Sequence, residues 1–177
     1  GTREIVRTQQ SNLGTLIANS MLYVTGADFA LMNGGGIRDS IPVGNITMKQ
    51  IYTVQPFGNF IQTGKVLGKE IDAILENGVG KLPAPDGRFP HVANLTYTLD
   101  ASKPAGDRVS NIMIGGEPID PEKEYTIATL NFIFNGGDDY RMLVGKAQND
   151  YPTDAEVFMA YIKYLGTITN DNIVFKK

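Results

Sequence analysis

The chain has 177 residues, of which 42% are hydrophobic and 20% charged, and its net charge at pH 7 is −3. A chain of this length fits one domain, which can bury well over half of its unfolded surface. The weakly negative charge, without a block of like charges, argues against a nucleic-acid polymer as partner. No apolar run approaches the roughly 20 residues that a membrane helix requires. The sequence holds one histidine and no cysteine, which excludes disulfides and thiolate metal sites. Because the carboxylates are scattered without metal-ligand spacing, we expect no metal or cofactor in this chain.

Helices and strands alternate in the first half of the chain. Hydrophobic spacing, capping residues and glycine stops predict the following elements in order: a helix that Ser11 caps and Gly26 ends, a strand at 29–32, a helix at 48–54 with a Thr47/Gln50 capping box, a strand at 59–67, and a helix that carries Ile71, Ile74 and Leu75 and closes at Gly78. A proline-rich loop at 82–87 follows. Because strand patterns resume directly after it, we interpret this loop as an excursion within one domain.

The second half is dominated by strands. From Val92 onward the hydrophobic pattern has a period of two. The predicted elements are a strand around 95–99, a hairpin of 109–114 and Ile119 joined by Gly115-Gly116, a strand at 125–130, a helix capped by Thr153 and Glu156, and a last strand at 173–175. The mixture predicts an α+β fold: a single domain with a mixed, mainly antiparallel β-sheet and packed helices.

The first candidate site is the segment Asn33-Gly34-Gly35-Gly36-Ile37-Arg38, which follows the buried strand. Three glycines can let backbone N–H groups face a ligand, and the guanidinium of Arg38 matches a phosphate or a carboxylate. The segment lacks the Gly-Lys-Ser/Thr ending of a Walker A loop and is not a dinucleotide fingerprint. A glycine-rich turn also serves purely structural purposes, and both interpretations stay open at this point.

Two aromatic residues occupy connections between elements. Phe57 lies inside Pro56-Phe57-Gly58, and Phe132 follows the strand at 125–130. Loops lie at the surface, so two such rings could clamp a flat heterocycle. The alternative is that each ring fills a small hydrophobic cluster beneath its loop.

Three further groups of polar residues are candidates. Asp138 ends the turn Asn135-Gly136-Gly137-Asp138 and can accept two hydrogen bonds from a ribose diol, or it can simply stabilise the turn. Arg3 and Arg7 share one side if the terminal segment is helical, and otherwise form a solvated surface. His91 lies at the start of a strand, where we expect no catalytic role.

Taken in order, these motifs resemble the C-terminal domain of the 5′-nucleotidase family, which includes bacterial UDP-sugar hydrolases and animal ecto-5′-nucleotidases. The resemblance covers nearly the whole of residues 1–177. It rests on five motifs: Ser11-Asn12-Leu13-Gly14-Thr15-Leu16-Ile17, Asn33 to Arg38, Tyr52-Thr53-Val54-Gln55-Pro56-Phe57-Gly58-Asn59, Gly106-Asp107-Arg108-Val109, and Phe132 with Asn135-Gly136-Gly137-Asp138.

The resemblance implies that this domain recognises a nucleoside or nucleotide for a metal-dependent phosphohydrolase. A preceding metallophosphoesterase domain, absent from this chain, would hold two divalent metal ions and the catalytic groups. The expected location is extracellular, periplasmic or at the cell surface. We expect residues 1–177 alone to be catalytically inactive. The alternative is a stand-alone nucleoside-binding or surface-interaction domain without catalysis.

The family also implies a role for individual residues. Phe57 and Phe132 would stack on the two faces of the base, and Asn33 would hydrogen-bond the nucleoside. The remaining implied contacts are Asp138 with the ribose hydroxyls, Arg7 and Arg38 with the phosphate, Arg3 as a further basic residue, and Asn59 with the base.

One position departs from the family pattern. Asp139 follows Asp138 where the family usually has glycine. A second carboxylate beside the ribose site would raise the pKa of its neighbour or repel a phosphate-rich ligand.

Overall fold

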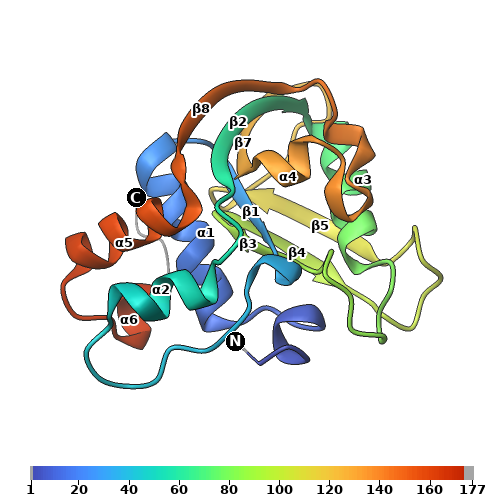
Figure 1. The fold of residues 1–177 in the computed structure, drawn as a ribbon. Helices are drawn as coiled ribbons and strands as arrows, with labels where there is room; N and C mark the ends of the chain where they lie inside the picture. Colours follow the sequence, from blue (N-terminus) through green and yellow to red (C-terminus); the bar gives the residue numbers. More distant parts are fainter. Residues whose placement is uncertain (1, 174–177) are drawn as a thin grey trace.

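A five-stranded sheet crosses the centre of the molecule in the computed structural model, which describes residues 2–173 (Figure 1). The strand order is β3-β1-β7-β2-β8. Only the β1–β7 pair is parallel, and the other three pairs are antiparallel. The strands are β1 (Phe29–Asn33), β2 (Phe60–Leu67), β3 (Pro90–Ala93), β7 (Glu124–Leu130) and β8 (Ala147–Thr153).

A second, smaller sheet has the order β4-β5-β6 and is antiparallel throughout. Its strands are β4 (Leu95–Leu99), β5 (Val109–Ile114) and β6 (Glu117–Pro118). The turn between β5 and β6 uses Gly115 and Gly116, whose φ values are 62° and 83°. These two glycines make the predicted hairpin, because residues with a side chain rarely adopt positive φ. The α+β prediction with mainly antiparallel pairing is therefore confirmed.

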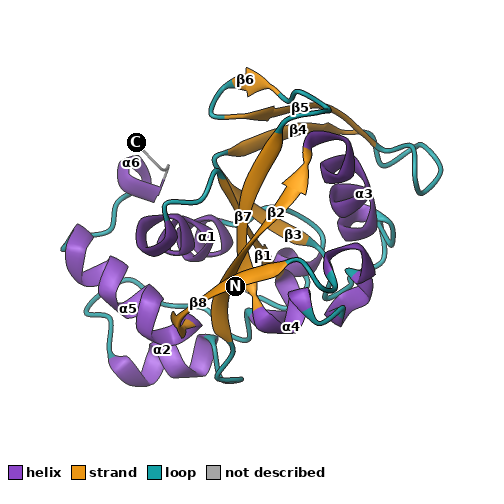
Figure 2. Cartoon of the chain, turned by 90° about the horizontal axis from the view of Figure 1, so that it is seen from above, coloured by secondary structure: helices purple, strands orange, loops and turns teal. Residues whose placement is uncertain are grey.

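Helices cover both faces of the larger sheet. Figure 2 shows α1, α2 and α5 on one side of the strands and α3 and α4 on the other. α1 packs against β1, β3 and α5, whereas α3 and α4 pack against β2. The helices are α1 (Asn12–Thr25), α2 (Met48–Val54), α3 (Gly68–Val79), α4 (Asn131–Phe134), α5 (Asp154–Leu165) and α6 (Asn170–Ile173), with 3-10 turns at Ile5–Arg7, Gly34–Gly36, Gly137–Asp139 and Arg141–Leu143.

Side-chain caps set the starts of three helices, as predicted. The Ser11 hydroxyl accepts a hydrogen bond from the Gly14 amide at 3.0 Å, and Gly26 ends α1 in the left-handed conformation. Thr47 and Thr153 form capping boxes at α2 and α5. Each cap satisfies backbone N–H groups that the first helical turn leaves unpaired, and is worth about 1 kcal/mol.

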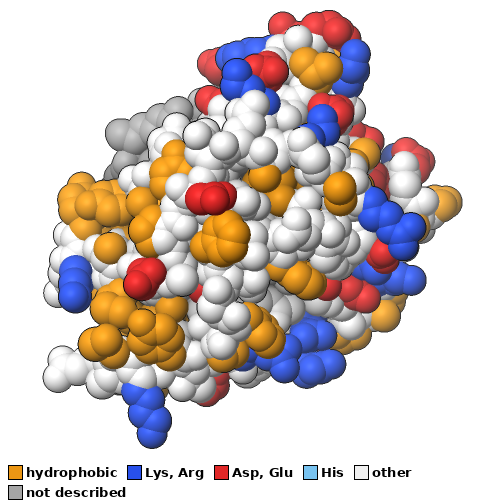
Figure 3. Space-filling view, turned by 45° about the horizontal axis from the view of Figure 1, so that its top comes forward, with side chains coloured by type: hydrophobic (Ala, Val, Ile, Leu, Met, Phe, Trp, Pro, Cys, Tyr) orange, Lys and Arg blue, Asp and Glu red, His pale blue; other side chains and the backbone are white. Residues whose placement is uncertain are grey.

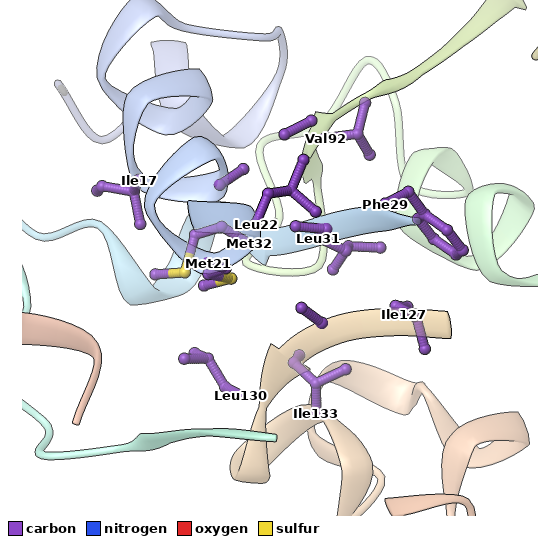
Figure 4. Close-up of a cluster of buried hydrophobic side chains, with 14 of the residues drawn as sticks. Ile17, Met21, Leu22, Phe29, Leu31, Met32, Val92, Ile127, Leu130 and Ile133 are labelled. Atoms are coloured by element: carbon purple, nitrogen blue, oxygen red, sulfur yellow. The ribbon is translucent and has the colours of Figure 1, made fainter. Parts of the chain in front are cut away.

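The core lies between α1, β1 and β7. All five residues of β1 are buried. Figure 4 shows the side chains that meet here, among them Ile17, Met21, Leu22, Leu31, Met32, Ile127, Leu130 and Ile133. Because burying one such side chain contributes roughly 1.5–3 kcal/mol, this cluster holds β1 in place, and β1 carries Asn33 at its end.

His91 is a structural residue, as expected. It lies in β3 and is fully buried. Its Nε2 lies 2.8 Å from the carbonyl oxygen of Val6, and its Nδ1 accepts a hydrogen bond from the Ser11 amide at 3.2 Å. Burial lowers the pKa of His91 to about 4, so the ring is neutral at pH 7. The ring joins the start of α1 to the 3-10 turn that carries Arg7.

Four details differ from the sequence-based expectations. α3 continues through Gly78 to Val79, Phe132 lies in the short helix α4 and not in a loop, and β8 had no predicted counterpart. β8 is a mostly exposed edge strand, so it lacks the alternating hydrophobic pattern that reveals strands. Of the strand expected at 173–175, Ile173 instead ends α6, and residues 174 and 175 lie outside the described part of the chain.

Candidate functional site

One cavity of about 640 Å³ brings together seven of the eight predicted site residues. Its walls come from six segments that are far apart in the sequence: the first 3-10 turn, the end of β1, the loop after α2, the loop before β3, α4, and the turn at 137–139. The lining residues are Arg7, Asn33, Gly35, Gly36, Arg38, Phe57, Asn59, Asp86, Gly87, Phe132 and Asp138. Arg3 is the predicted site residue that does not line the cavity.

The amides of Gly34 and Gly35 bond other backbone segments, although the sequence suggested that they could face a ligand. The Gly34 amide donates to the Phe89 carbonyl and the Gly35 amide to the Gly87 carbonyl, both at 2.8 Å. A Cβ on Gly34 would collide with the Val6 carbonyl, and one on Gly35 would lie 3.1 Å from the Cα of Gly87. The expectation that these N–H groups face a ligand is therefore wrong for Gly34 and Gly35. The glycines instead allow three backbone segments to approach one another closely.

The side chains of Asn33 and Asp138, which both line the cavity, are joined by a hydrogen bond. The Asn33 Nδ2 donates to Oδ2 of Asp138 at 2.6 Å. Asn33 is 2% exposed, and its Oδ1 has no hydrogen-bond partner among the described residues. Burial raises the pKa of the Asp138 carboxyl, while the hydrogen bond from Asn33 acts to lower it. An unpaired buried acceptor is costly, and a hydrogen bond to this oxygen would remove that cost.

The two aromatic rings are exposed at the cavity walls. Phe57 is 58% exposed and Phe132 is 40% exposed, so neither ring fills a hydrophobic cluster beneath its loop. A Cβ on Gly137 would lie 2.5 Å from the Phe132 ring, which shows that the ring rests directly on this glycine. Among the ring contacts of residues 2–173, Phe57 and Phe132 do not pair with each other. Each ring therefore has surface to offer to a ligand.

The arginines make one side of the site positive. Arg38 is exposed, and its guanidinium carbon lies 5.6 Å from the centre of the Phe57 ring. Burial and the nearby charges of Arg3 and Arg38 lower the pKa of Arg7. Arg3 thus acts on the cavity through its charge although it does not line it. Three cations whose charges act on one another favour an anion near them.

The neighbouring Asp139 does not lie where the sequence suggested. It is absent from the cavity lining, and its carboxylate pairs with Arg88 Nη2 at 2.7 Å and Arg141 Nη2 at 3.3 Å. The expectation of a second carboxylate at the ribose position through Asp139 is therefore wrong, because the side chain turns toward these arginines.

Sequence reasoning missed Asp86 and Gly87, which line the cavity from the loop before β3. The loop at 82–87 has no hydrophobic pattern that could place it. Two long-range backbone hydrogen bonds bring it to the site, one from the Gly35 amide to the Gly87 carbonyl and one from the Asp86 amide to the Arg7 carbonyl. Gly87 was part of a proline- and glycine-containing turn, which by itself indicates only a change of direction.

Other features of residues 2–173 do not form a second candidate site with the predicted residues. Within residues 2–173, no three His, Cys, Asp or Glu side chains lie close enough to hold a metal ion together, and no helix is long and apolar enough to span a membrane. A second groove of about 700 Å³ lies between the start of α1, the loop at 41–46, the end of α5, and α6. None of the predicted site residues lines this groove.

Comparisons with known proteins agree with this architecture. The model of the family "5′-nucleotidase, C-terminal domain" matches residues 1–145. Protein UshA of Escherichia coli is 42% identical over 165 residues, which cover 92% of this chain and 29% of UshA. A 5′-nucleotidase of Vibrio vulnificus is 37% identical over 184 residues, which cover 99% of this chain and 32% of that protein.

A solved structure shows the same fold. The crystal structure of a 5′-nucleotidase precursor from Thermus thermophilus matches 94% of this chain and 35% of that chain, with a TM-score of 0.88 and 44% identity. This chain thus spans about a third or less of the length of these relatives. It belongs to the 5′-nucleotidase C-terminal domain family.

Proposed function

We propose that this chain is the nucleotide-recognition domain of a 5′-nucleotidase-type hydrolase and that it holds a nucleobase between Phe57 and Phe132. The observation that carries the proposal is the pair of exposed rings lining one cavity without contacting each other. Phe132 is supported from behind by Gly137. Stacking on an aromatic ring contributes about 1–3 kcal/mol per base and tolerates any base, so the rings supply affinity and little base selectivity.

The sugar would bind at Asp138 and Asn33. An ionised carboxylate accepts hydrogen bonds from both hydroxyls of a ribose, and the unpaired Oδ1 of Asn33 adds an acceptor for the nucleoside. The bond from Asn33 to Asp138 holds the carboxylate in one orientation before a ligand arrives. Such preorganisation reduces the entropy that binding costs.

The phosphate would lie toward Arg7 and Arg38, with Arg3 adding to the positive potential. Asn59 lines the same cavity and would contact the edge of the base. A mononucleotide has a flat apolar base, a diol and a terminal anion, and the cavity offers a matching group for each.

The chemistry would take place on a separate domain with two divalent metal ions. The scattered carboxylates and single histidine of this chain support that assignment, as does the greater length of the relatives. Binding energy collected on the nucleoside can then be used at the phosphate, which is how a domain without catalytic groups raises kcat/KM. We place such an enzyme in nucleotide catabolism outside the cytoplasm, in the periplasm or at the cell surface.

A small-molecule ligand also suits the surface of the chain better than a nucleic-acid polymer does. Figure 3 shows acidic, basic and hydrophobic side chains mixed over one face, without a continuous basic stripe among the described residues drawn there.

The proposal is tested by titration calorimetry on residues 1–177 with three probes: adenosine, AMP and ribose 5-phosphate. We expect adenosine to bind with a Kd of about 1 mM or lower, since the isolated domain lacks any contacts made by a second domain. AMP should bind more tightly than adenosine because of the arginines, and ribose 5-phosphate about tenfold or more weakly than AMP because it has no base. Equal affinity for AMP and ribose 5-phosphate, or no heat with adenosine and AMP, would contradict the proposal. Equal affinity for adenosine and AMP would favour the alternative of a nucleoside-binding module without catalysis.

A further inference from the structure

We propose that Asp86 is a specificity-determining residue of this site, which together with Asp138 forms an acidic wall that accepts the hydroxyl edge of a ribose and rejects a phosphate there. This inference rests on the function proposed above. It assigns a role to a residue that neither the motifs nor the glycine-rich segments single out.

The two carboxylates lie on the same side of the cavity. Asp86 and Gly87 line it together with Asp138, and a Cβ on Gly87 would lie 3.4 Å from Oδ2 of Asp138. The backbone next to Asp86 therefore lies beside the Asp138 carboxylate, with room for little more than a methyl group between them. The two carboxylates also repel each other, and the charge of Asp86 acts to raise the pKa of Asp138.

Protein groups bind only one of the two carboxylate oxygens of Asp86 among the described residues. Its Oδ1 accepts hydrogen bonds from the backbone N and the Nε of Arg88, both at 3.0 Å. Its Oδ2 accepts no hydrogen bond from the described residues, and Asp86 lines the cavity. Arg88 is itself fixed, because Nη2 pairs with Asp139 at 2.7 Å and its side chain is 16% exposed. One oxygen of Asp86 is thus oriented by the protein while the other is free for a ligand.

A second feature of the cavity is a buried polar side chain in its lining. Asn33 is 2% exposed, and its Oδ1 has no partner among the described residues. The carboxylates of Asp138 and Asp86 add acceptors to the same lining. Acceptors select ligand groups that donate, and hydroxyls do so.

Charge is distributed unevenly across the site. Asp86 and Asp138 are the two carboxylates that line the cavity, and Arg88 pairs with Asp86 from behind. Arg7 lies next to them, since the Asp86 amide donates to the Arg7 carbonyl at 3.3 Å, whereas the exposed Arg38 lies beside Phe57. A 3′-phosphate would replace a donating hydroxyl by an anion next to two carboxylates, which costs both a hydrogen bond and electrostatic free energy.

The experiment compares adenosine with 3′-AMP by titration calorimetry at low salt on three proteins. These are the wild-type chain, Asp86→Asn, and the matched control Asp139→Asn. Both substitutions remove one carboxylate that pairs with Arg88, but only Asp86 lines the cavity. The ratio of the two affinities is the decisive quantity, because a loss of folded protein lowers both affinities equally.

We expect the wild-type chain to bind adenosine at least about tenfold more tightly than 3′-AMP. Asp86→Asn should reduce this preference about tenfold, since an amide can donate to the phosphate, while Asp139→Asn should change it less than about twofold. High salt should weaken the wild-type preference because it screens the repulsion.

Three results would overturn the inference while leaving the proposed function intact. The first is a wild-type chain that binds adenosine and 3′-AMP with equal affinity. The second is an unchanged affinity ratio in Asp86→Asn, and the third is the same change of the ratio in Asp139→Asn. A wild-type chain that binds adenosine, AMP and 3′-AMP not at all would instead refute the proposed function, and the role of Asp86 with it.

Discussion

Replacing Phe57 by alanine should weaken nucleotide binding strongly and leave the fold almost unchanged. The ring is 58% exposed, and the guanidinium carbon of Arg38 lies 5.6 Å from its centre. An exposed cation–π contact contributes about 0.5–1 kcal/mol, and surface substitutions usually change stability by less than about 0.5 kcal/mol. Loss of one stacking face, in contrast, removes about 1–3 kcal/mol of binding free energy. We therefore expect the Kd for AMP to rise about 5- to 150-fold in Phe57→Ala.

The assay is titration calorimetry with AMP, accompanied by thermal unfolding. Tyr52→Ala is the matched control, since Tyr52 is an aromatic residue of α2 that is 47% exposed and does not line the cavity. Its Kd should stay within about twofold of wild type. Phe57→Trp should retain binding because it keeps a stacking face. A Kd in Phe57→Ala equal to that of Tyr52→Ala, with both proteins folded, would refute the idea of a base clamp.

Three other predictions concern catalysis and stability. Residues 1–177 should hydrolyse no AMP with added Mg²⁺, Mn²⁺ or Zn²⁺, and turnover that copurifies with the chain through successive columns would argue otherwise. Burial raises the pKa of Asp154 to about 6, although the Ala155 amide donates to it. Since the ionised form is the disfavoured one, its penalty is complete above that pKa and vanishes as the pH falls toward ordinary aspartate values. Asp154→Asn should therefore raise the free energy of unfolding in urea by about 2 kcal/mol near pH 8 but not near pH 4, and an equal effect at both would contradict this. Gly14→Ala should lower that free energy by about 1–3 kcal/mol, because its Cβ would collide with the buried His91 ring; a rise, as helix propensity alone would give, would disprove the packing.

The helices and most strands were predictable because their signals are local. Ser11, Thr47 and Thr153 cap helices through bonds to residues three positions later, and such spacing is visible in the sequence. β8 escaped prediction because its partner is β2, far away in the chain, and its own residues are polar and exposed. Pairing at a sheet edge depends on backbone hydrogen bonds, which leave little trace in side-chain pattern.

The sequence predicted those residues of the candidate site that belong to a recognisable motif. Phe57 and Asp138 stand beside glycine or proline in turns, Phe132 follows a predicted strand, and the structure brings all three to one cavity. Asp86 could not be found in this way, because its place depends on the long-range bond between Gly35 and Gly87. The direction of the Asp139 side chain likewise depends on Arg88, which is 51 residues away in the chain.

The central claim is that a nucleobase lies between Phe57 and Phe132. The most direct test is an NMR measurement of nuclear Overhauser effects between the base protons of bound adenosine and the ring protons of the chain. We predict effects from the adenine protons to both rings, each lost only in the corresponding Phe→Leu variant. The claim would be contradicted if adenosine gave no effect to either ring and instead shifted only the resonances of the groove between α1, the loop at 41–46, α5 and α6.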